Sequence, residues 1–319
     1  MKVLITGVAG FVGGHLVELL RAEHAAVEVF GLDKPQGAAL AELPGGARGL
    51  PVDLEEAAEV SAAIGEIRPD RVIHLAGQSS VGHSWADPGA TLRANVLGIV
   101  HLMEALERHA PAARVLVVGS AEEYGCVSPA LTPIEETAPL RPNSPYAVSK
   151  AAQGLLALQY AGPGGLAVML TRTFPHTGPR RGEAFAESSF ARQIAEIEAG
   201  RREPILEVGN LEAVRDFSDV RDVVRAYWAL LGAGRSGEAY NVCSGNGVRI
   251  RDLLQTLMDC CRVPIEVRVD PARLRPSDIP ELVGDPTKLK RATGWEPRFP
   301  LGRTLADLLD YWRARTAGS

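Results

Sequence analysis

The chain has 319 residues, of which 46% are hydrophobic and 23% are charged, as in ordinary globular proteins. Its formal net charge of −5 argues against a general nucleic-acid binder, which would present a basic face. The four cysteines follow no metal-ligand pattern, so no metal site is expected. We find no signal peptide and no apolar run of about 18 residues. The sequence therefore predicts a cytoplasmic protein with no membrane partner.

Five apolar, β-branched runs within residues 1–174 predict buried strands. They lie at residues 2–6, 27–33, 71–77, 114–120 and 166–174. Helical periodicity lies between them, including residues 90–109 and 145–161. Strands that alternate with helices and are apolar throughout form parallel sheets covered on both faces. The sequence therefore predicts an α/β fold, a Rossmann-type doubly wound parallel sheet.

The pattern changes after residue 174. Helical segments there alternate with short strands such as PILEVG and EAYNVCSG. We therefore expect a first domain at residues 1–174 and a smaller C-terminal α/β lobe at residues 175–319. Some segments of the second part are expected to return to the first domain.

A glycine-rich stretch, TGVAGFVG, directly follows the first strand and opens a helix. Gly7, Gly10 and Gly13 are spaced so that the backbone can turn tightly and approach a pyrophosphate, while the helix N-terminus supplies N–H groups and partial positive charge. A glycine pattern alone is weak, but this position favours a dinucleotide site over a structural turn. Phe11 and Val12 complete the expected cofactor loop.

Asp33 ends the second predicted strand, where an acidic residue can accept hydrogen bonds from the ribose hydroxyls of an adenosine. Its charge would repel a 2′-phosphate, so NAD(H) is the favoured cofactor. The adjacent Lys34 could offset that repulsion, which keeps NADP(H) as the alternative. Asp53, after a further predicted strand, is expected near the adenine.

The segment PNSPYAVSK contains the start of a helix, with Ser144 as N-cap and Pro145 as first helical residue. Tyr146 and Lys150 then lie one turn apart on the same face. The ammonium could lower the pKa of the tyrosine and hold a nicotinamide ribose. Tyr146 could then transfer a proton at a sugar oxygen while hydride moves at the carbon.

A third member of this group is expected at the end of the strand at 114–120. Ser120 could bond the substrate oxygen that Tyr146 serves. Glu122, two residues later, could act as a base at an adjacent carbon or bond substrate hydroxyls.

Further motifs accompany these residues along almost the whole chain. They include HLAGQSSV, NVLG, GSAEEYG, YAVSK, RTFPHTGP, VRDFSDVRDVV, YNVCSG and TGWEP. Together with TGVAGFVG they resemble the extended short-chain dehydrogenase/reductases, the NAD-dependent epimerase/dehydratase family that acts on nucleotide sugars. VGNLEAVRDFSDVRDVVRAYW and RLRPSDIPELVGD resemble its GDP-mannose branch, which includes 4,6-dehydratases and the reductases that form GDP-D-rhamnose.

Other motifs divide between these two activities. GFVGGHL, LAGQSSVGHSW and VGSAEEYG resemble the reductases. The dehydratases typically carry Gln-Asp-Gly after the second motif glycine and an Arg pair after the second strand, where this chain has Phe11-Val12-Gly13 and Asp33-Lys34. PRRGEAF, by contrast, is similar to the dehydratase pattern. The resemblance therefore identifies the branch and leaves the member open.

The resemblance also implies roles for individual residues. Ser120, Tyr146 and Lys150 match catalytic positions, and Glu122 matches the base of the dehydratases. Arg215 and Arg275 match positions that hold the phosphates of the sugar nucleotide, which agrees with the bidentate donors that arginine offers. The remaining expected contacts are Leu54, Leu75, Ala76 and Gly77 for the cofactor, and Ser80, His176 and Arg192 for the substrate.

One position departs from the family pattern. The family usually has Asn before the His of FNHTGP, and here the residue is Pro175. Proline has neither a side-chain donor nor an N–H. A substrate contact is therefore lost, or it is supplied by His176 or Thr177, and the resemblance does not fix the sugar.

The leading hypothesis is a reductase, in which NAD(P)H delivers hydride to C4 of a GDP-4-keto-6-deoxyhexose and Tyr146 donates the proton. The first alternative is a GDP-mannose 4,6-dehydratase with Glu122 as base, and the next is a nucleotide-sugar 4-epimerase. A non-catalytic dinucleotide-binding protein would be expected to carry a damaged triad, whereas Ser120, Tyr146 and Lys150 are all present. Residues 1–174 are then expected to bind the dinucleotide and residues 175–319 mainly the nucleotide sugar.

A homodimer is also expected. Residues 90–109 and 145–161 lie where this superfamily forms a four-helix interface between two subunits. The apolar face of these helices is predicted to include Leu102, Leu155, Leu156 and Leu158.

Overall fold

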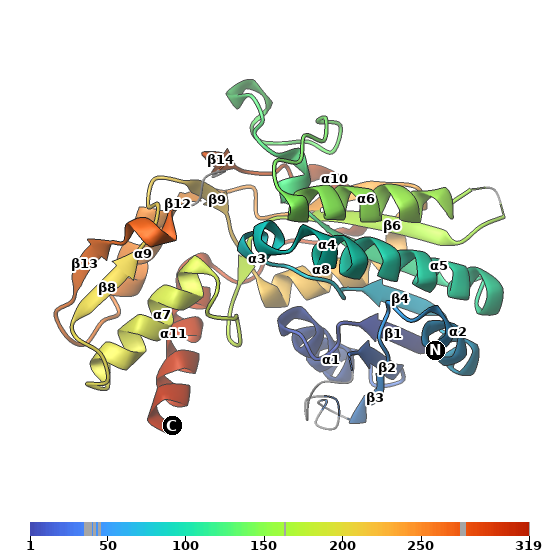
Figure 1. Ribbon diagram of the computed structural model, residues 1–319, viewed down its shortest axis with the longest axis horizontal. Helices are drawn as coiled ribbons and strands as arrows, with labels where there is room; N and C mark the ends of the chain where they lie inside the picture. Colours follow the sequence, from blue (N-terminus) through green and yellow to red (C-terminus); the bar gives the residue numbers. More distant parts are fainter. Residues whose placement is uncertain (35–39, 41–42, 44–45, 163, 275–278, 319) are drawn as a thin grey trace.

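A parallel sheet of seven strands forms the centre of the described molecule. The computed structural model describes residues 1–34, 40, 43, 46–162, 164–274 and 279–318, so Arg275 lies outside the described residues. Every strand pair of this sheet is parallel, which confirms the Rossmann-type α/β fold (Figure 1). In spatial order the strands are β11 (Ala239–Val242), β6 (Ala167–Thr173), β5 (Arg114–Ser120), β4 (Arg71–His74), β1 (Lys2–Thr6), β2 (Glu28–Asp33) and β3 (Arg48–Pro51).

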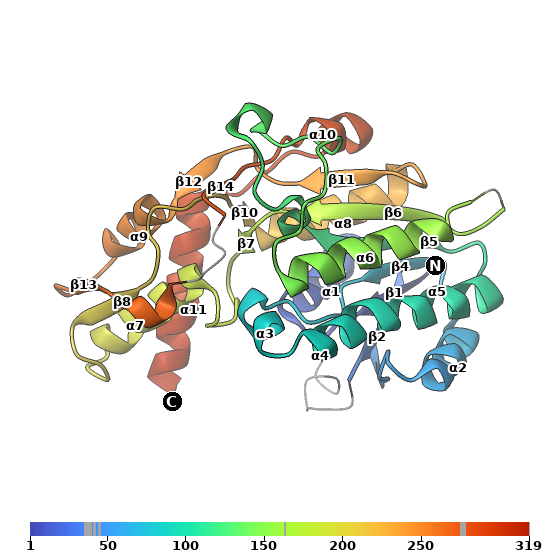
Figure 2. The same cartoon turned by 45° about the horizontal axis from the view of Figure 1, so that its top comes forward.

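Helices cover both faces of the sheet, because strands with continuous apolar residues must be buried on both sides. Figure 2 shows α5 and α6 side by side on one of these faces. The long helices of each layer share one of two buried apolar clusters with the strands, and the short α3 and α4 contact α6. One layer consists of α2 (Ala57–Ile67), α5 (Gly98–His109) with the preceding α3 (Val81–Ala86) and α4 (Pro88–Leu92), and α6 (Pro145–Gln159); the other consists of α1 (Phe11–Glu23), α8 (Val220–Ala233) and α10 (Thr287–Thr293).

A smaller α/β lobe lies beside the sheet and has an apolar core of its own (Figure 1). Within the described ranges, no helix is long and apolar enough to cross a membrane. The lobe contains α7 (Ala186–Glu198), α9 (Ile250–Met258) and α11 (Leu301–Gly318), the strand pair β8 (Ile205–Val208) and β13 (Glu266–Val269), and the strands β12 (Gly247–Arg249), β9 (Val214–Asp216) and β14 (Glu281–Leu282).

The second half of the chain also contributes to the main sheet. β11 pairs with β6, and α8 and α10 pack on one face. A short parallel pair joins the segment after β6 to the start of α8. The chain therefore crosses between the two units more than once, which brings residues of both to one cavity. The short elements are β7 (His176–Thr177) and β10 (Ser218–Asp219), with 3-10 turns at Ala121–Tyr124, Pro129–Leu131 and Pro271–Arg273.

A π-helical turn at Arg93–Leu97 interrupts the helix expected at residues 90–109. Such turns are frequent at functional sites. Asn95 within it is fully buried. Its side chain accepts a hydrogen bond from the Gln78 N–H at 2.7 Å and donates one to the Gln78 carbonyl at 3.0 Å. The turn therefore fixes the loop that follows β4.

The structure corrects one residue of the expected dimer face. Leu102 is fully buried among the side chains between α5 and the sheet, whereas Leu155 on α6 is 56% exposed. Leu156 is half-buried, and Leu158 packs against the same core as Leu102. The prediction for Leu102 was wrong because helical spacing alone does not show which side of α5 faces the sheet.

Replacing Leu102 with Ala should lower the free energy of unfolding by about 2–5 kcal/mol, because the change removes buried contacts and leaves a cavity. Urea denaturation followed by circular dichroism measures the difference. Leu131→Ala is the control, since Leu131 is 45% exposed and its truncation should cost less than about 0.5 kcal/mol. Equal losses in the two variants would contradict the core position of Leu102.

Candidate active site

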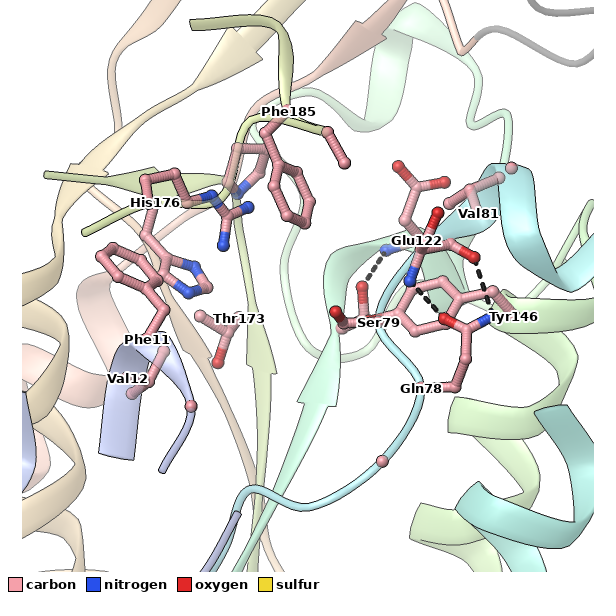
Figure 3. A pocket seen from close by; sticks show the side chains of 18 of the residues that line it. Phe11, Val12, Gln78, Ser79, Val81, Glu122, Tyr146, Thr173, His176 and Phe185 are labelled. Atoms are coloured by element: carbon pink, nitrogen blue, oxygen red, sulfur yellow. Dashed lines mark hydrogen bonds between the residues drawn. The ribbon is translucent and has the colours of Figure 1, made fainter. Parts of the chain in front are cut away.

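A large cavity of about 1360 Å³ lies between the carboxyl ends of the sheet strands and the smaller lobe. The ends of β1, β2, β4, β5 and β6 meet in its wall because these strands are parallel. Figure 3 shows Phe11 and His176 on one side of the space and Glu122 and Tyr146 on the other. Pockets for one small ligand commonly measure about 300–1,000 Å³, so this cavity exceeds the usual volume for a single small ligand.

The loop from β1 to α1 forms one end of the cavity. Gly7 has a φ of +72°, which favours glycine, and a Cβ there would lie 2.8 Å from the backbone nitrogen of Ala76. A Cβ on Gly13 would lie 2.5 Å from the carbonyl oxygens of Gly7 and Val8. The N-cap of α1, Gly10, makes no side-chain hydrogen bond. The first N–H groups of a helix have no intrahelical partner, so they can donate hydrogen bonds to a pyrophosphate when no side chain covers them.

The end of β2 forms the adjoining wall. Oδ2 of Asp33 accepts a hydrogen bond from the Ala9 N–H at 2.9 Å, which holds the carboxylate against the glycine loop. The Lys34 ammonium contacts two other carboxylates: Nζ lies 2.9 Å from Glu55 and 3.3 Å from Asp53. The wall therefore presents the carboxylate expected to bind ribose hydroxyls, with its neighbouring lysine engaged elsewhere.

Tyr146 lies in the first turn of α6, as the Ser-Pro helix start predicts. Ser144 caps this helix by accepting a hydrogen bond from the Ala147 N–H at 3.1 Å. Burial raises the pKa of Tyr146 to about 12, although the Ser120 hydroxyl is within hydrogen-bonding reach of the phenol and opposes the rise. The expected lowering of this pKa by Lys150 was wrong, because burial outweighs the favourable contacts. The phenol therefore holds its proton at neutral pH.

Lys150 lies one turn later on α6 and is almost fully buried. Its Nζ donates hydrogen bonds to the Val118 carbonyl at 2.9 Å and to the Gln153 side-chain oxygen at 2.8 Å. Burial lowers the pKa of Lys150 to about 8, and the nearby Glu123 carboxylate limits the fall. A negatively charged ligand in the cavity would favour the protonated lysine further.

Ser120 ends β5 and caps the short 3-10 turn that follows. Its Oγ accepts a hydrogen bond from the Glu122 N–H at 3.2 Å, and its own N–H donates to Glu123 at 2.7 Å. Glu123 is buried and lies 3.6 Å from the guanidinium of Arg172. This buried ion pair fixes the turn, so that Glu122 lines the cavity beside Tyr146 (Figure 3).

The segment after β6 carries the proline that departs from the family pattern. The Pro175 carbonyl accepts a hydrogen bond from the Ser218 N–H at 3.0 Å. The His176 ring lines the cavity and stacks on Phe11, with ring centres 6.1 Å apart. Burial lowers the pKa of His176 to about 3, so the ring is neutral. Thr177 is fully buried and outside the described cavity wall, so His176 is the better placed to meet a ligand.

Arg181 is a cavity residue that the sequence prediction missed. Its guanidinium lies 3.3 Å from the ring centre of Phe185 and 5.1 Å from that of Phe11. Nε lies 3.4 Å from Glu187, and both side chains are largely buried. This arrangement places a cation within the cavity, where it suits an anionic ligand. The PRRGEAF motif contained the signal, but it was interpreted only as a mark of the family branch.

One serine connects this arginine with the last helix. Ser188 donates a hydrogen bond to the Arg181 carbonyl at 2.6 Å and accepts one from the Trp312 indole at 2.9 Å. The second bond joins residues 124 positions apart in the chain, and the first joins residues seven positions apart. The position of Arg181 therefore depends on α11 as well as on its own loop.

The structure brings most of the predicted site residues to this cavity. Arg192 is an exception, because it pairs with Glu183 at 3.0 Å and Glu196 at 3.3 Å and lies outside the described wall. No group of His, Cys, Asp or Glu in the described ranges could hold a metal ion. Predicted residues in the wall are Gly7, Gly10, Phe11, Val12, Gly13, Asp33, Asp53, Leu54, Leu75, Ala76, Gly77, Ser80, Ser120, Glu122, Tyr146, Lys150, His176 and Arg215. Further wall residues that were not predicted include Glu55, Gln78, Ser79, Thr173, Phe185, Tyr227 and Arg273.

The sequence profile of the family described as GDP-mannose 4,6 dehydratase matches residues 4–308 of this chain. The chain belongs to this family of extended short-chain dehydrogenase/reductases. Family membership confirms the resemblance carried by the motifs. Within the family, the chain is 38% identical to the GDP-6-deoxy-D-mannose reductase of Pseudomonas aeruginosa, over 98% of each protein.

Solved structures related to this family share the whole fold. The reductase RMD from Pseudomonas aeruginosa, complexed with NADPH, matches 98% of this chain and 99% of its own with a TM-score of 0.86 and 36% identity. The UDP-glucose 4-epimerase of Thermus thermophilus, complexed with NAD, matches 98% and 99% with a TM-score of 0.87 and 33% identity. One relative therefore holds NADPH and the other NAD.

Replacing Lys150 with Met should remove a pH dependence of stability. Burial depresses the pKa of Lys150 from 10.5 to about 8. Between these values the unfolded chain binds one proton more than the folded chain, so the wild type gains stability as the pH rises. The variant should lack this gain when both proteins are unfolded with urea across the range.

Lys34→Met is the control, because the hydrogen bond to Glu55 raises the pKa of Lys34 and leaves its titration above this range. That variant should keep the wild-type slope. Parallel stability curves for Lys150→Met and the wild type would contradict the buried, depressed lysine.

Proposed function

We propose that the protein is a cytoplasmic NAD(P)-dependent reductase that acts at C4 of a GDP-4-keto-6-deoxyhexose. The observation that carries the proposal is that Ser120, Tyr146 and Lys150 line one cavity with the bare glycine loop and with Arg215. The bound dinucleotide supplies the hydride, and the chain supplies the proton and the orientation. Identity of 38% to a reductase over nearly the whole chain supports this choice among the activities of the family.

The two parts of the chain would divide the ligands between them. The glycine loop and Asp33 favour placing the dinucleotide on residues 1–174, with NAD(H) preferred. Arg215 and Arg273 line the cavity from the smaller lobe, residues 175–319. Arginine offers bidentate donors to phosphate, which supports the nucleotide sugar on this side.

Tyr146 would donate the proton to the C4 oxygen of the substrate. Its raised pKa keeps the phenol protonated until negative charge develops on that oxygen. Ser120, beside the phenol, would hold the same oxygen. Lys150, when protonated, would stabilise the phenolate that forms and favour rapid proton transfer.

Glu122 supports a second candidate function, a GDP-mannose 4,6-dehydratase. Its carboxylate lies beside Tyr146 in the cavity, where it could remove a proton from a sugar carbon (Figure 3). The profile that matches the chain is that of the dehydratases. A 4-epimerase is a third candidate, supported by the structural match to an enzyme of that type.

The purified protein should oxidise NADH or NADPH when a GDP-4-keto-6-deoxyhexose is supplied, and not when GDP-mannose is supplied. Absorbance of the reduced cofactor and chromatography of the sugar nucleotides measure both reactions. Conversion of GDP-mannose without a reductant would replace the reductase proposal with the dehydratase.

In the same assay, Tyr146→Phe should lower turnover at least about 100-fold, because the proton donor is lost while the ring remains. Tyr160→Phe is the matched control on the C-cap of the same helix and lies outside the described cavity wall. Its turnover should stay at the wild-type level. Wild-type turnover in Tyr146→Phe would refute the role of the phenol.

We also propose that the protein forms a homodimer through α4, the π-turn after it and α6. These three elements contact one another. The support for the proposal is a group of apolar side chains that they expose to solvent. The group consists of Leu92 at 42%, Leu97 at 40%, Val148 at 45% and Leu155 at 56% exposed.

Replacing Leu155 with Glu should convert the dimer to a monomer, because the change places a charge in the apolar interface. Light scattering at micromolar protein concentration measures the mass. Leu131→Glu is the control, since Leu131 is exposed on a different segment and its replacement should leave the dimer intact. A monomeric wild type would contradict the proposal.

A further inference from the structure

Charged side chains gather where β2 and β3 reach the cavity. Asp33, Lys34, Asp53 and Glu55 line the wall there, and Arg93 contacts Glu55 from the π-turn. Three carboxylates thus meet two cations. The proposed function places the adenosine ribose of the dinucleotide at this wall, and the present inference rests on that placement.

Glu55 is the residue that joins the two cations. Its Oε1 accepts a hydrogen bond from Lys34 Nζ at 2.9 Å, and its Oε2 lies 3.7 Å from Arg93 Nε. The Glu55 N–H donates to Asp53 Oδ1 at 3.0 Å, which orients the backbone of this residue. The second oxygen of Asp53 lies 3.3 Å from Lys34 Nζ. Two carboxylates therefore hold the one ammonium.

The position of Lys34 connects its pairing with Glu55 and Asp53 to the binding of a 2′-phosphate. Lys34 directly follows Asp33, so its ammonium is the cation best placed to offset the repulsion between Asp33 and a 2′-phosphate. A lysine already paired with two carboxylates can bind that phosphate only by giving up those contacts. The Lys34 side chain is 51% exposed and that of Glu55 25%, so the glutamate is the more firmly placed partner.

We propose that Glu55 is a cofactor-selectivity residue, which occupies Lys34 and thereby disfavours NADP(H) relative to NAD(H). Asp33 supplies the repulsion of the 2′-phosphate, and Glu55 keeps that repulsion from being neutralised. Selectivity of this kind combines an attractive contact for one ligand with an unfavourable contact for its competitor. The carboxylate of Glu55 acts through Lys34 and needs no contact with either cofactor.

Replacing Glu55 with Gln tests the proposal. Fluorescence titration of the purified protein with NADH and with NADPH gives the two dissociation constants. The ratio of the NADPH constant to the NADH constant should fall about two- to fivefold, because the freed lysine can then contact a phosphate with the modest strength of an exposed ion pair. The change should shrink at high salt, since exposed charges are screened.

Two further variants separate this mechanism from a change in net charge. Glu56→Gln removes the same charge one residue away, from an exposed side chain outside the described wall, and should leave the ratio unchanged. The double variant Glu55→Gln/Lys34→Ala should lose the gain in NADPH affinity. Asp53→Asn removes the second carboxylate partner of Lys34 and should shift the ratio in the same direction by less, which gives an independent test if Glu55→Gln does not fold.

The outcomes are distinct. An unchanged ratio in Glu55→Gln, an equal shift in Glu56→Gln, or a gain that survives loss of Lys34 would overturn the proposal. A wild type that binds neither NADH nor NADPH would instead overturn the proposed function on which it rests.

Discussion

The cavity depends on how closely the loop after β1 approaches the loop after β4. A Cβ on Gly7 would lie 2.8 Å from the backbone nitrogen of Ala76, so the two backbones meet with no side chain between them. Asn95 holds the second of these loops from its other side through the backbone of Gln78. The N-terminus of α1 and the carboxyl ends of the strands can therefore face one space.

On the opposite side of that space, the buried ion pair of Glu123 and Arg172 holds the turn after β5. Glu123 binds the Ser120 N–H, and its partner Arg172 donates hydrogen bonds to the Tyr124 hydroxyl at 3.1 Å and the Glu136 carbonyl at 2.8 Å. A buried ion pair is costly to break when one partner is removed, because the other charge is left unpaired. Residues that hold the turn after β5 in place are thus different from Ser120 and Glu122, which line the cavity.

Local spacing made part of this site predictable from the sequence. Gly7 and Gly13 belong to a strand–helix junction, and Tyr146 and Lys150 share one helix face, so a short stretch of sequence suffices to place each pair. Most of the parallel sheet was predictable for the same reason, since β1, β2, β4, β5 and β6 follow largely apolar runs, whereas β3 and β11 do not.

The features that the sequence did not predict depend on packing between distant segments. Lys34 meets Glu55 only because β2 pairs with β3 and brings the ends of both strands together. The direction in which Leu102 faces depends on how α5 lies against the sheet. The pKa of Tyr146 depends on its burial, which no motif shows.

The hydrogen bonds of Ser188 have a practical consequence for work with this protein. They connect Trp312, near the end of the last helix, to the backbone of Arg181 in the cavity wall. Ligand affinity can therefore respond to changes at a helix that lies outside the cavity. A reporter fused to the C-terminus, or attachment of that end to a sensor surface, needs a spacer long enough to leave α11 in its place.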